Sequence, residues 1–158
     1  MNAPENIESK PSTPPVGAGG LSINEIQDEI IEEFELFDDW ADKYEYIIDL
    51  GKKLKPFPDE AKTEENIIKG CQSRVWLNAK KDGENLVFEA DSEAIIVKGL
   101  VAILVRILSN QKPKEIANAD LYFIDRIGMT SHLAQTRSNG LASMVKKMKE
   151  AAVFQLNS

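Results

Sequence analysis

Two alternating segments in the middle of the chain put the strongest constraint on its fold. Apolar residues occupy every second position on both sides of Asp82-Gly83, a dipeptide typical of two-residue hairpin turns. Pairing Lys81 with Glu84 would align three apolar pairs on one face: Val75 with Ala90, Leu77 with Phe88, and Ala79 with Leu86. Because a shift of one residue would move one apolar set to the opposite face, the pattern predicts an antiparallel hairpin in this register.

Helical patterns precede the hairpin. Ser22 and Glu25 have the spacing of a capping box, in which each side chain accepts a hydrogen bond from the backbone N–H of the other residue. An apolar stripe follows at three- and four-residue steps: Ile23, Ile26, Ile30, Phe34 and Phe37. A second helix is expected to begin after Asp38 or Asp39 and to end near Gly51.

Helical patterns also follow the hairpin. Ser92 is predicted to cap a helix at residues 93–109, which is apolar around most of its circumference and is therefore expected at the centre of the fold. Pro113 is expected to open a short helix. A polar loop at residues 128–137 then leads to a last amphipathic helix, for which Ser138 is the predicted cap.

The order of these elements predicts an α+β fold. A short strand at residues 65–69 is expected to join the hairpin, because two strands alone are marginally stable. The predicted architecture is thus a small antiparallel three-stranded sheet with helices packed against it. Residues 21–158 are expected to form a single domain. Residues 1–20, rich in proline and glycine and poor in apolar residues, are expected to be a disordered tail, to which the sequence assigns no role.

Composition excludes several classes of function. The chain carries 19 basic and 26 acidic residues, a net charge of −7, so it lacks the basic surface that nucleic acids and anionic membranes require. One cysteine allows no internal disulfide, and one histidine leaves too few ligands for a zinc or iron-sulfur site. The most apolar stretch, residues 94–108, is too short and too charged to span a membrane. Because no secretory or transit signal is evident, we expect a cytoplasmic protein.

Cys71 is the only strong nucleophile in the sequence. Gly70 indicates a turn before it and an alternating strand begins just after it, so the thiol is expected at a turn between two strands, where a rigid sheet can present it to a partner. A lone cysteine often serves as a small buried hydrophobe, but polar neighbours such as Lys69 and Gln72 argue against a dry core. Because no second cysteine can resolve a disulfide, the thiol suits a covalent carrier that accepts a group and passes it on.

Two other functions stay open when only the residues are considered. A cysteine-dependent hydrolase would use His132 as its general base. An adaptor would bind a partner enzyme through the acidic helix face at residues 28–42 and leave Cys71 structural. Positive charge near a thiol lowers its pKa. Four cationic side chains are candidates for that role: Lys69, Arg74, His132 and Arg137.

Five short motifs follow one another along residues 22–150. They are Trp40 with Lys43-Tyr44 and residues 46–51; residues 70–73 with Val75-Trp76; Asp91-Ser92 with residues 96–100; His132-Leu133; and residues 137–141. With these motifs the chain resembles SufE, the sulfur-acceptor protein of the Suf iron-sulfur assembly system. The proline- and glycine-rich tail is the main departure from the compact members of that family.

The resemblance implies a fold, partners and a chemical role. SufE-like proteins have an α+β sandwich similar to IscU-type scaffolds. They take sulfane sulfur from the persulfide of SufS, a pyridoxal-phosphate cysteine desulfurase, and pass it toward the downstream iron-sulfur scaffold. The sulfur-accepting cysteine of the family corresponds to Cys71, and the resemblance implies no cofactor or metal of its own and no turnover without the desulfurase. A monomer and a homodimer are both compatible with the sequence.

Overall fold

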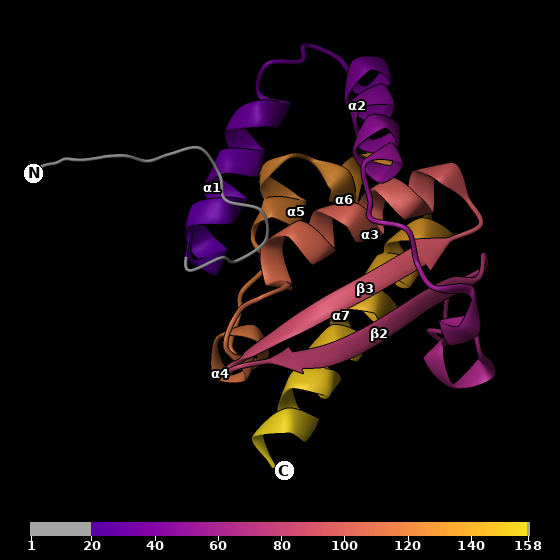
Figure 1. Cartoon of the computed structure of the whole chain (residues 1–158). Coiled ribbons are helices and arrows are strands. Elements are labelled where there is room, and N and C mark those ends of the chain that lie inside the picture. Colours follow the sequence, from indigo (N-terminus) through magenta and orange to yellow (C-terminus); the bar gives the residue numbers. More distant parts are fainter. Residues whose placement is uncertain (1–19, 158) are drawn as a thin grey trace, which may run out of the picture.

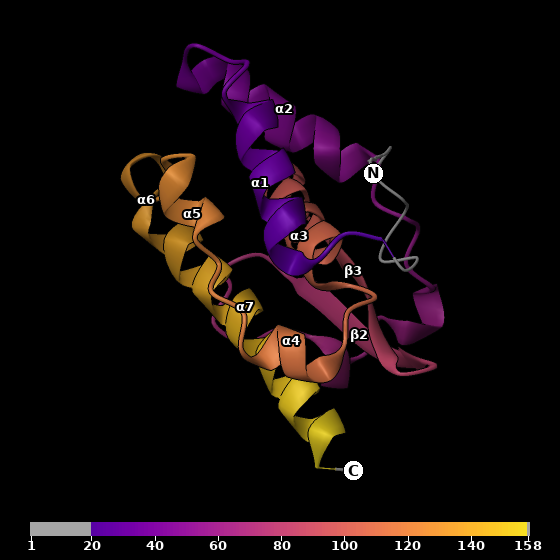
Figure 2. The same cartoon turned by 90° about the vertical axis from the view of Figure 1, so that its left-hand side faces the viewer.

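An antiparallel hairpin and a central helix organise the fold (Figure 1). The computed structural model describes residues 20–157, so the predicted tail lies outside the described residues except for Gly20. The helices and strands in chain order are α1 (Ile23–Phe34), α2 (Trp40–Lys52), η1 (Asp59–Ala61), η2 (Glu64–Asn66), β2 (Val75–Asp82), β3 (Asn85–Ser92), α3 (Ile95–Leu108), α4 (Pro113–Ala117), α5 (Phe123–Arg126), α6 (Met129–His132) and α7 (Gln135–Leu156). Helix α3 contacts β3, α1, α2 and α7 (Figure 2), which confirms the α+β class.

The first two helices begin at the predicted capping residues. The backbone N–H of Ser22 donates to Oε1 of Glu25 at 2.9 Å, and the N–H of Glu25 donates to Oγ of Ser22 at 3.2 Å. At the start of α2, Oδ1 of Asp39 accepts a hydrogen bond from the N–H of Asp42 at 2.9 Å. These side chains satisfy N–H groups that have no partner inside the helix, so the sequence predicts both helix starts correctly.

The hairpin forms where predicted, but its register differs by two residues. The observed pairs on the apolar face are Val75 with Ser92, Leu77 with Ala90, and Ala79 with Phe88. Asp82 pairs with Asn85, which leaves Gly83 and Glu84 as the two turn residues. Gly83 has φ of 63°, the left-handed conformation that a type II′ turn needs at its first central position. The predicted pairing of Lys81 with Glu84 is therefore wrong, although each side chain keeps its face.

The predicted third strand is also wrong. Within residues 20–157 the sheet has two strands, and residues 64–66 form the 3₁₀ helix η2. Ile67 makes an isolated bridge with Trp76, and the N–H of Ile68 donates to the carbonyl of Val75 at 2.8 Å. The pairing goes no further because Gly70, with φ of 94°, turns the chain away from the hairpin. Packing against α3, rather than a third strand, stabilises the two strands.

Helix α3 begins two residues later than predicted. Its first residue is Ile95, and Ala94 rather than Ser92 occupies the capping position. The Ser92 hydroxyl donates to the carbonyl of Arg74 at 2.9 Å and accepts from the N–H of Ala94 at 3.3 Å. Ser92 therefore fastens the end of β3 to the start of β2 and to the turn that enters the helix.

Helix α7 begins at Gln135, three residues before the predicted cap Ser138. Helix α6 and this first turn occupy most of the predicted loop at residues 128–137. The turn is polar and exposed, so it carries no apolar periodicity that would reveal a helix. A hydrogen bond from Nε2 of Gln135 to Oδ1 of Asn139 at 2.9 Å spans it.

Helix α3 forms the centre of the core. Nine of its 14 residues are buried, yet no helix among residues 20–157 combines the length and apolar character needed to cross a lipid bilayer. Helix α2 crosses α3 in direct backbone contact. A Cβ atom on Gly99 would lie 2.1 Å from the carbonyl oxygen of Ile47, and one on Gly51 would lie 2.7 Å from the nitrogen of Gly99. The crossing therefore requires the absence of a side chain at both glycines.

Substituting Gly99 tests this crossing. We expect Gly99→Ala to lower the free energy of unfolding by about 2–3 kcal/mol through overpacking, although alanine favours a helix by about 1 kcal/mol. Urea unfolding of the full chain measures the change. Gly83→Ala is the control, because a Cβ there meets no atom within 4 Å and adds only left-handed strain of about 1 kcal/mol. A smaller loss for Gly99→Ala than for Gly83→Ala would contradict a backbone contact.

Candidate functional site

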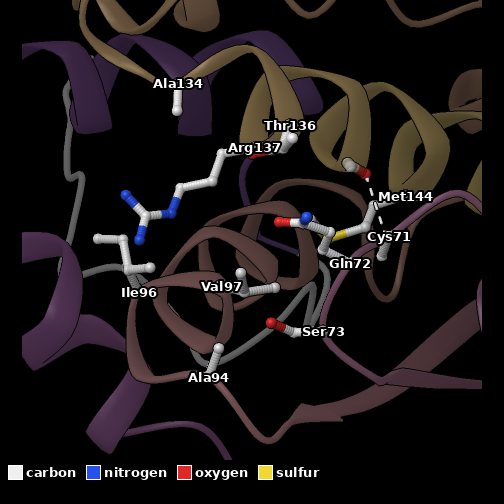
Figure 3. A pocket seen from close by; sticks show the side chains of 11 residues that line it. Cys71, Gln72, Ser73, Ala94, Ile96, Val97, Ala134, Thr136, Arg137 and Met144 are labelled. Carbon is white, nitrogen blue, oxygen red and sulfur yellow. Dashed lines mark hydrogen bonds between the residues drawn. The ribbon is translucent and has the colours of Figure 1, made fainter.

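Cys71 lies at a turn, as the sequence predicts, but this turn joins η2 to β2 and does not connect two strands. Its side chain is half-buried against α7. Two glycines bring the turn close to that helix. A Cβ on Gly70 would lie 2.4 Å from Oγ of Ser143, and a Cβ on Gly140 would lie 3.5 Å from Sγ of Cys71. The thiol donates a weak hydrogen bond to the carbonyl of Gly140 at 3.6 Å, marked by the dashed line in Figure 3.

A cavity of about 230 Å³ opens beside Cys71 (Figure 3). The turn after the cysteine, the start of α3 and the first turns of α7 line it. Its apolar walls include Ile96, Val97 and Met144, and its polar walls include Gln72, Ser73 and Arg137. The thiol is therefore not sealed in a dry core, and a small molecule or a partner's side chain can reach the cavity that it faces.

Burial raises the pKa of the Cys71 thiol above that of an exposed cysteine. At neutral pH the resting thiol is consequently protonated. A protonated thiol is a poor nucleophile and is oxidised more slowly than a thiolate. The site as it stands stores the thiol in its unreactive form.

The four cationic candidates from the sequence lie in different places. Lys69 is exposed. Arg74 makes two hydrogen bonds to Glu93, from Nε at 3.2 Å and from Nη2 at 2.8 Å, and its guanidinium lies over the ring of Trp76. Glu93 and Trp76 thus hold the guanidinium of Arg74, and Arg74 is not among the causes that shift the pKa of the resting thiol.

His132 stacks on Trp40, with ring centroids 4.5 Å apart and ring planes 16° apart. Its Nδ1 lies 3.0 Å from the carbonyl oxygen of Gly128, and it is not among the residues that line the Cys71 cavity. The structure therefore does not bring together the cysteine and histidine that a hydrolase of this kind would need.

Arg137 does line the cavity, and its guanidinium is held by α2. Nη1 of Arg137 donates to the hydroxyl of Tyr44, and the guanidinium carbon lies 5.7 Å from the centre of the Tyr44 ring. Figure 3 shows the Arg137 side chain extending away from Cys71 toward Ile96. Sequence reasoning named Arg137 but missed Tyr44, because no local pattern signals a contact between residues 93 positions apart.

The acidic face of α1 is partly used inside the fold. Nη2 of Arg106 contacts Oε2 of Glu33 at 2.6 Å and Oε1 of Glu29 at 3.4 Å, and the hydroxyl of Tyr46 donates to Glu33 at 2.5 Å. Burial alone would raise the pKa of Glu33, but the hydrogen bonds from Arg106 and Tyr46 outweigh it and lower that pKa. Burial and the Glu33 carboxylate raise the pKa of Tyr46 to about 12. This network fastens α1, α2 and α3, which leaves fewer carboxylates for a docking partner.

The part of the chain that the structure describes contains no cluster of three or more His, Cys, Asp or Glu side chains placed to hold a metal ion. The chemistry of this site therefore centres on the thiol, the guanidinium and the cavity between them.

The chain is similar to known proteins in both sequence and fold. Residues 28–152 match the family described as SufE, Fe-S metabolism associated domain. An uncharacterized SufE-like protein from Rhizobium meliloti (strain 1021) is 44% identical over 134 residues, which cover 82% of this chain and 96% of that protein. Another, from Rhizobium etli, is 46% identical over 130 residues, 79% of this chain and 88% of that protein. The solution structure of a hypothetical protein from Thermus thermophilus shares the fold, with a TM-score of 0.70, 17% identity and coverage of 84% and 97% of the two chains.

The raised pKa of Cys71 predicts the pH dependence of its alkylation. Because only the thiolate reacts, we expect the rate with iodoacetamide to rise with pH through a midpoint above that of an exposed thiol. The rate constant is measured across neutral and alkaline pH in the folded protein. The same protein in denaturant, where Cys71 is solvated, is the control. Equal midpoints in the two states would show that burial does not hold the thiol in its protonated form.

Proposed function

The chain belongs to the SufE family, whose domain is associated with Fe-S metabolism, and on that premise we propose that it is a sulfur carrier for iron-sulfur cluster assembly. In this proposal Cys71 accepts sulfane sulfur from a SufS-like cysteine desulfurase and passes it toward a downstream scaffold. The protein has no turnover without the desulfurase and binds no cofactor of its own. The exchange takes place in the cytoplasm, where the reducing environment keeps a single thiol free.

The observation that carries the proposal is the position of the thiol. Cys71 is half-buried at a turn, beside a cavity that reaches solvent, and its thiol donates a weak hydrogen bond to the carbonyl of Gly140. A carrier needs a thiol that a partner can reach but that solvent oxidants reach poorly. A second cysteine nearby would displace the carried sulfur by forming a disulfide, and this sequence has a single cysteine.

The transfer consists of two thiol-exchange steps. The Cys71 thiolate attacks the terminal sulfur of the desulfurase persulfide. The bond between that sulfur and the desulfurase cysteine breaks, and the desulfurase cysteine leaves as a thiolate. Cys71 then carries a persulfide, from which a second thiolate removes the terminal sulfur in the same way. No electrons are gained or lost overall, so neither step needs an external oxidant or reductant.

The resting geometry opposes the first step, because burial keeps the thiol protonated. We therefore propose that docking of the desulfurase opens the turn at residues 70–73 and exposes Sγ. The contacts that hold this turn support the idea. Gly70 and Gln72 are exposed, and the hydrogen bond from Cys71 to Gly140 is long and involves a weak donor.

Intact mass separates a carrier from an adaptor. The protein is incubated with a cysteine desulfurase, free cysteine and pyridoxal phosphate. We expect the wild-type chain to gain the mass of one sulfur atom and Cys71→Ser to gain none. The matched control is His132→Ala, which alters an exposed residue outside the cavity and should gain sulfur as the wild type does. No added mass in any of these proteins, with desulfurase turnover stimulated equally by Cys71→Ser, would instead support an adaptor.

Hydrogen exchange tests the opening of the Cys71 turn. The exchange rate of the amides at residues 70–73 is measured relative to that of the exposed hairpin turn at residues 83–84. We expect this relative rate to be lower in the free protein than in the complex with the desulfurase. The hairpin turn is the internal reference because it lies at the opposite end of β2 from Val75 (Figure 1), the end that Cys71 precedes in the chain. The result would argue against opening if residues 70–73 exchange more slowly than the hairpin turn both in the free protein and in the complex.

A further inference from the structure

The cavity beside Cys71 has a thiol at one end and a guanidinium at the other (Figure 3). We infer that this cavity binds small thiols that carry a carboxylate, the class that includes 3-mercaptopropionate and free cysteine. Arg137 binds the carboxylate, and the thiolate of the bound molecule removes the sulfane sulfur from Cys71. The inference rests on the proposed function only in that Cys71 carries a persulfide.

Arg137 differs from Arg74 and Arg106 in its partners. Arg74 pairs with Glu93 and Arg106 pairs with Glu33, each at hydrogen-bond distance. Among residues 20–157, the structure gives Arg137 a tyrosine hydroxyl and a ring but no carboxylate within 4.0 Å. A half-buried guanidinium without an anion attracts one, because its charge is screened less than that of an exposed side chain.

The Tyr44 contact leaves the guanidinium competent to bind an anion. A guanidinium has five N–H donors, and the hydrogen bond from Arg137 to Tyr44 uses one of them. The ring of Tyr44 lies beside the charge and fixes the side chain without neutralising it. The donors that remain form the planar fork that binds a carboxylate through both oxygens. A carboxylate therefore fits this end of the cavity better than an alcohol or an amine.

The walls between the two ends set the size of the ligand. Ile96, Val97 and Met144 line the cavity with hydrocarbon, and the space measures about 230 Å³. Pockets for drug-sized ligands typically measure about 300–1,000 Å³, so this one suits a smaller molecule with a short aliphatic linker. A mercaptocarboxylate has that form, since a few carbon atoms join its thiol to its carboxylate.

The chemical step is a thiol exchange that balances without a co-reactant. The thiolate of the small molecule attacks the terminal sulfur of the Cys71 persulfide. A new S–S bond forms, the bond between the terminal sulfur and Sγ of Cys71 breaks, and the electron pair goes to Sγ. The small molecule leaves as a persulfide that keeps the terminal proton, and Sγ takes a proton from solvent to restore the resting thiol.

The experiment uses a persulfide loaded without any desulfurase. The full-length protein is treated with inorganic polysulfide, freed of excess reagent, and mixed with 3-mercaptopropionate or with 2-mercaptoethanol. Intact mass follows the loss of the extra sulfur from Cys71. The measured quantity is the ratio of the two rate constants. Dividing the wild-type ratio by that of a variant cancels the intrinsic reactivities of the two thiols.

The variants remove the guanidinium or loosen it. We expect Arg137→Leu to lower the ratio about tenfold, the size of one charge-assisted interaction in a half-buried site. Tyr44→Phe, which keeps the ring and loses the hydroxyl, should lower it less. The matched control is Arg126→Leu. The guanidinium carbon of Arg126 lies 5.2 Å from the centre of the Tyr122 ring, but Arg126 does not line the cavity. Its ratio should equal that of the wild type.

A competition with the unchanged protein gives a second test that no folding defect can obscure. Propionate should slow the reaction with 3-mercaptopropionate, and 1-propanol at the same concentration should not. Equal ratios in the wild type and Arg137→Leu, or equal effects of propionate and 1-propanol, would overturn the inference. Failure of a desulfurase to load Cys71, with the ratios as expected, would overturn the proposed function and leave the ligand assignment standing.

Discussion

The backbone contact between α2 and α3 sets the geometry on which the rest of the site depends. Because Gly99 has no side chain, the carbonyl of Ile47 lies directly against α3. The crossing fixes the position of α2, which carries Tyr44 about one turn before Ile47. Tyr44 then holds Arg137 from α7 at the end of the cavity. The backbone contact between α2 and α3 thus determines where the guanidinium of Arg137 lies in the cavity beside Cys71.

Two requirements on the thiol oppose each other, and the turn around Cys71 meets both. Gly70 and Gly140 let the turn approach α7 closely, which partly desolvates Sγ and raises the pKa of the thiol. The same approach leaves one side of the cysteine facing the cavity rather than the hydrophobic core. Protection therefore comes from desolvation, and access comes from the open side. In the proposed function, a docked desulfurase would lower the pKa of the Cys71 thiol by supplying polar contacts to the thiolate. Because Cys71 lies in a turn, this would require no helix or strand to unfold.

Sequence periodicity revealed much of this fold and little of the site. The capping box at Ser22 and the hairpin were predictable because both depend on residues close in sequence. The register was not, since a shift of two residues preserves the alternation and the conformation of Gly83 decided it. The position of Cys71 at a turn was predictable from Gly70 before it and from the alternating residues after it. The contact between Tyr44 and Arg137 was hidden, because tertiary packing alone brings α2 and α7 together.

The charge of the protein makes anion binding a local property of the cavity. A net charge of −7 repels anions at long range, but salt screens that repulsion beyond about 8–10 Å. Arg137 lines the same cavity as Cys71, so its charge acts directly on an anion that enters there. If the proposed function holds, a desulfurase that reaches the thiol through this opening would exclude a small anionic thiol from the cavity. Sulfur would then leave to a small molecule only from the undocked carrier.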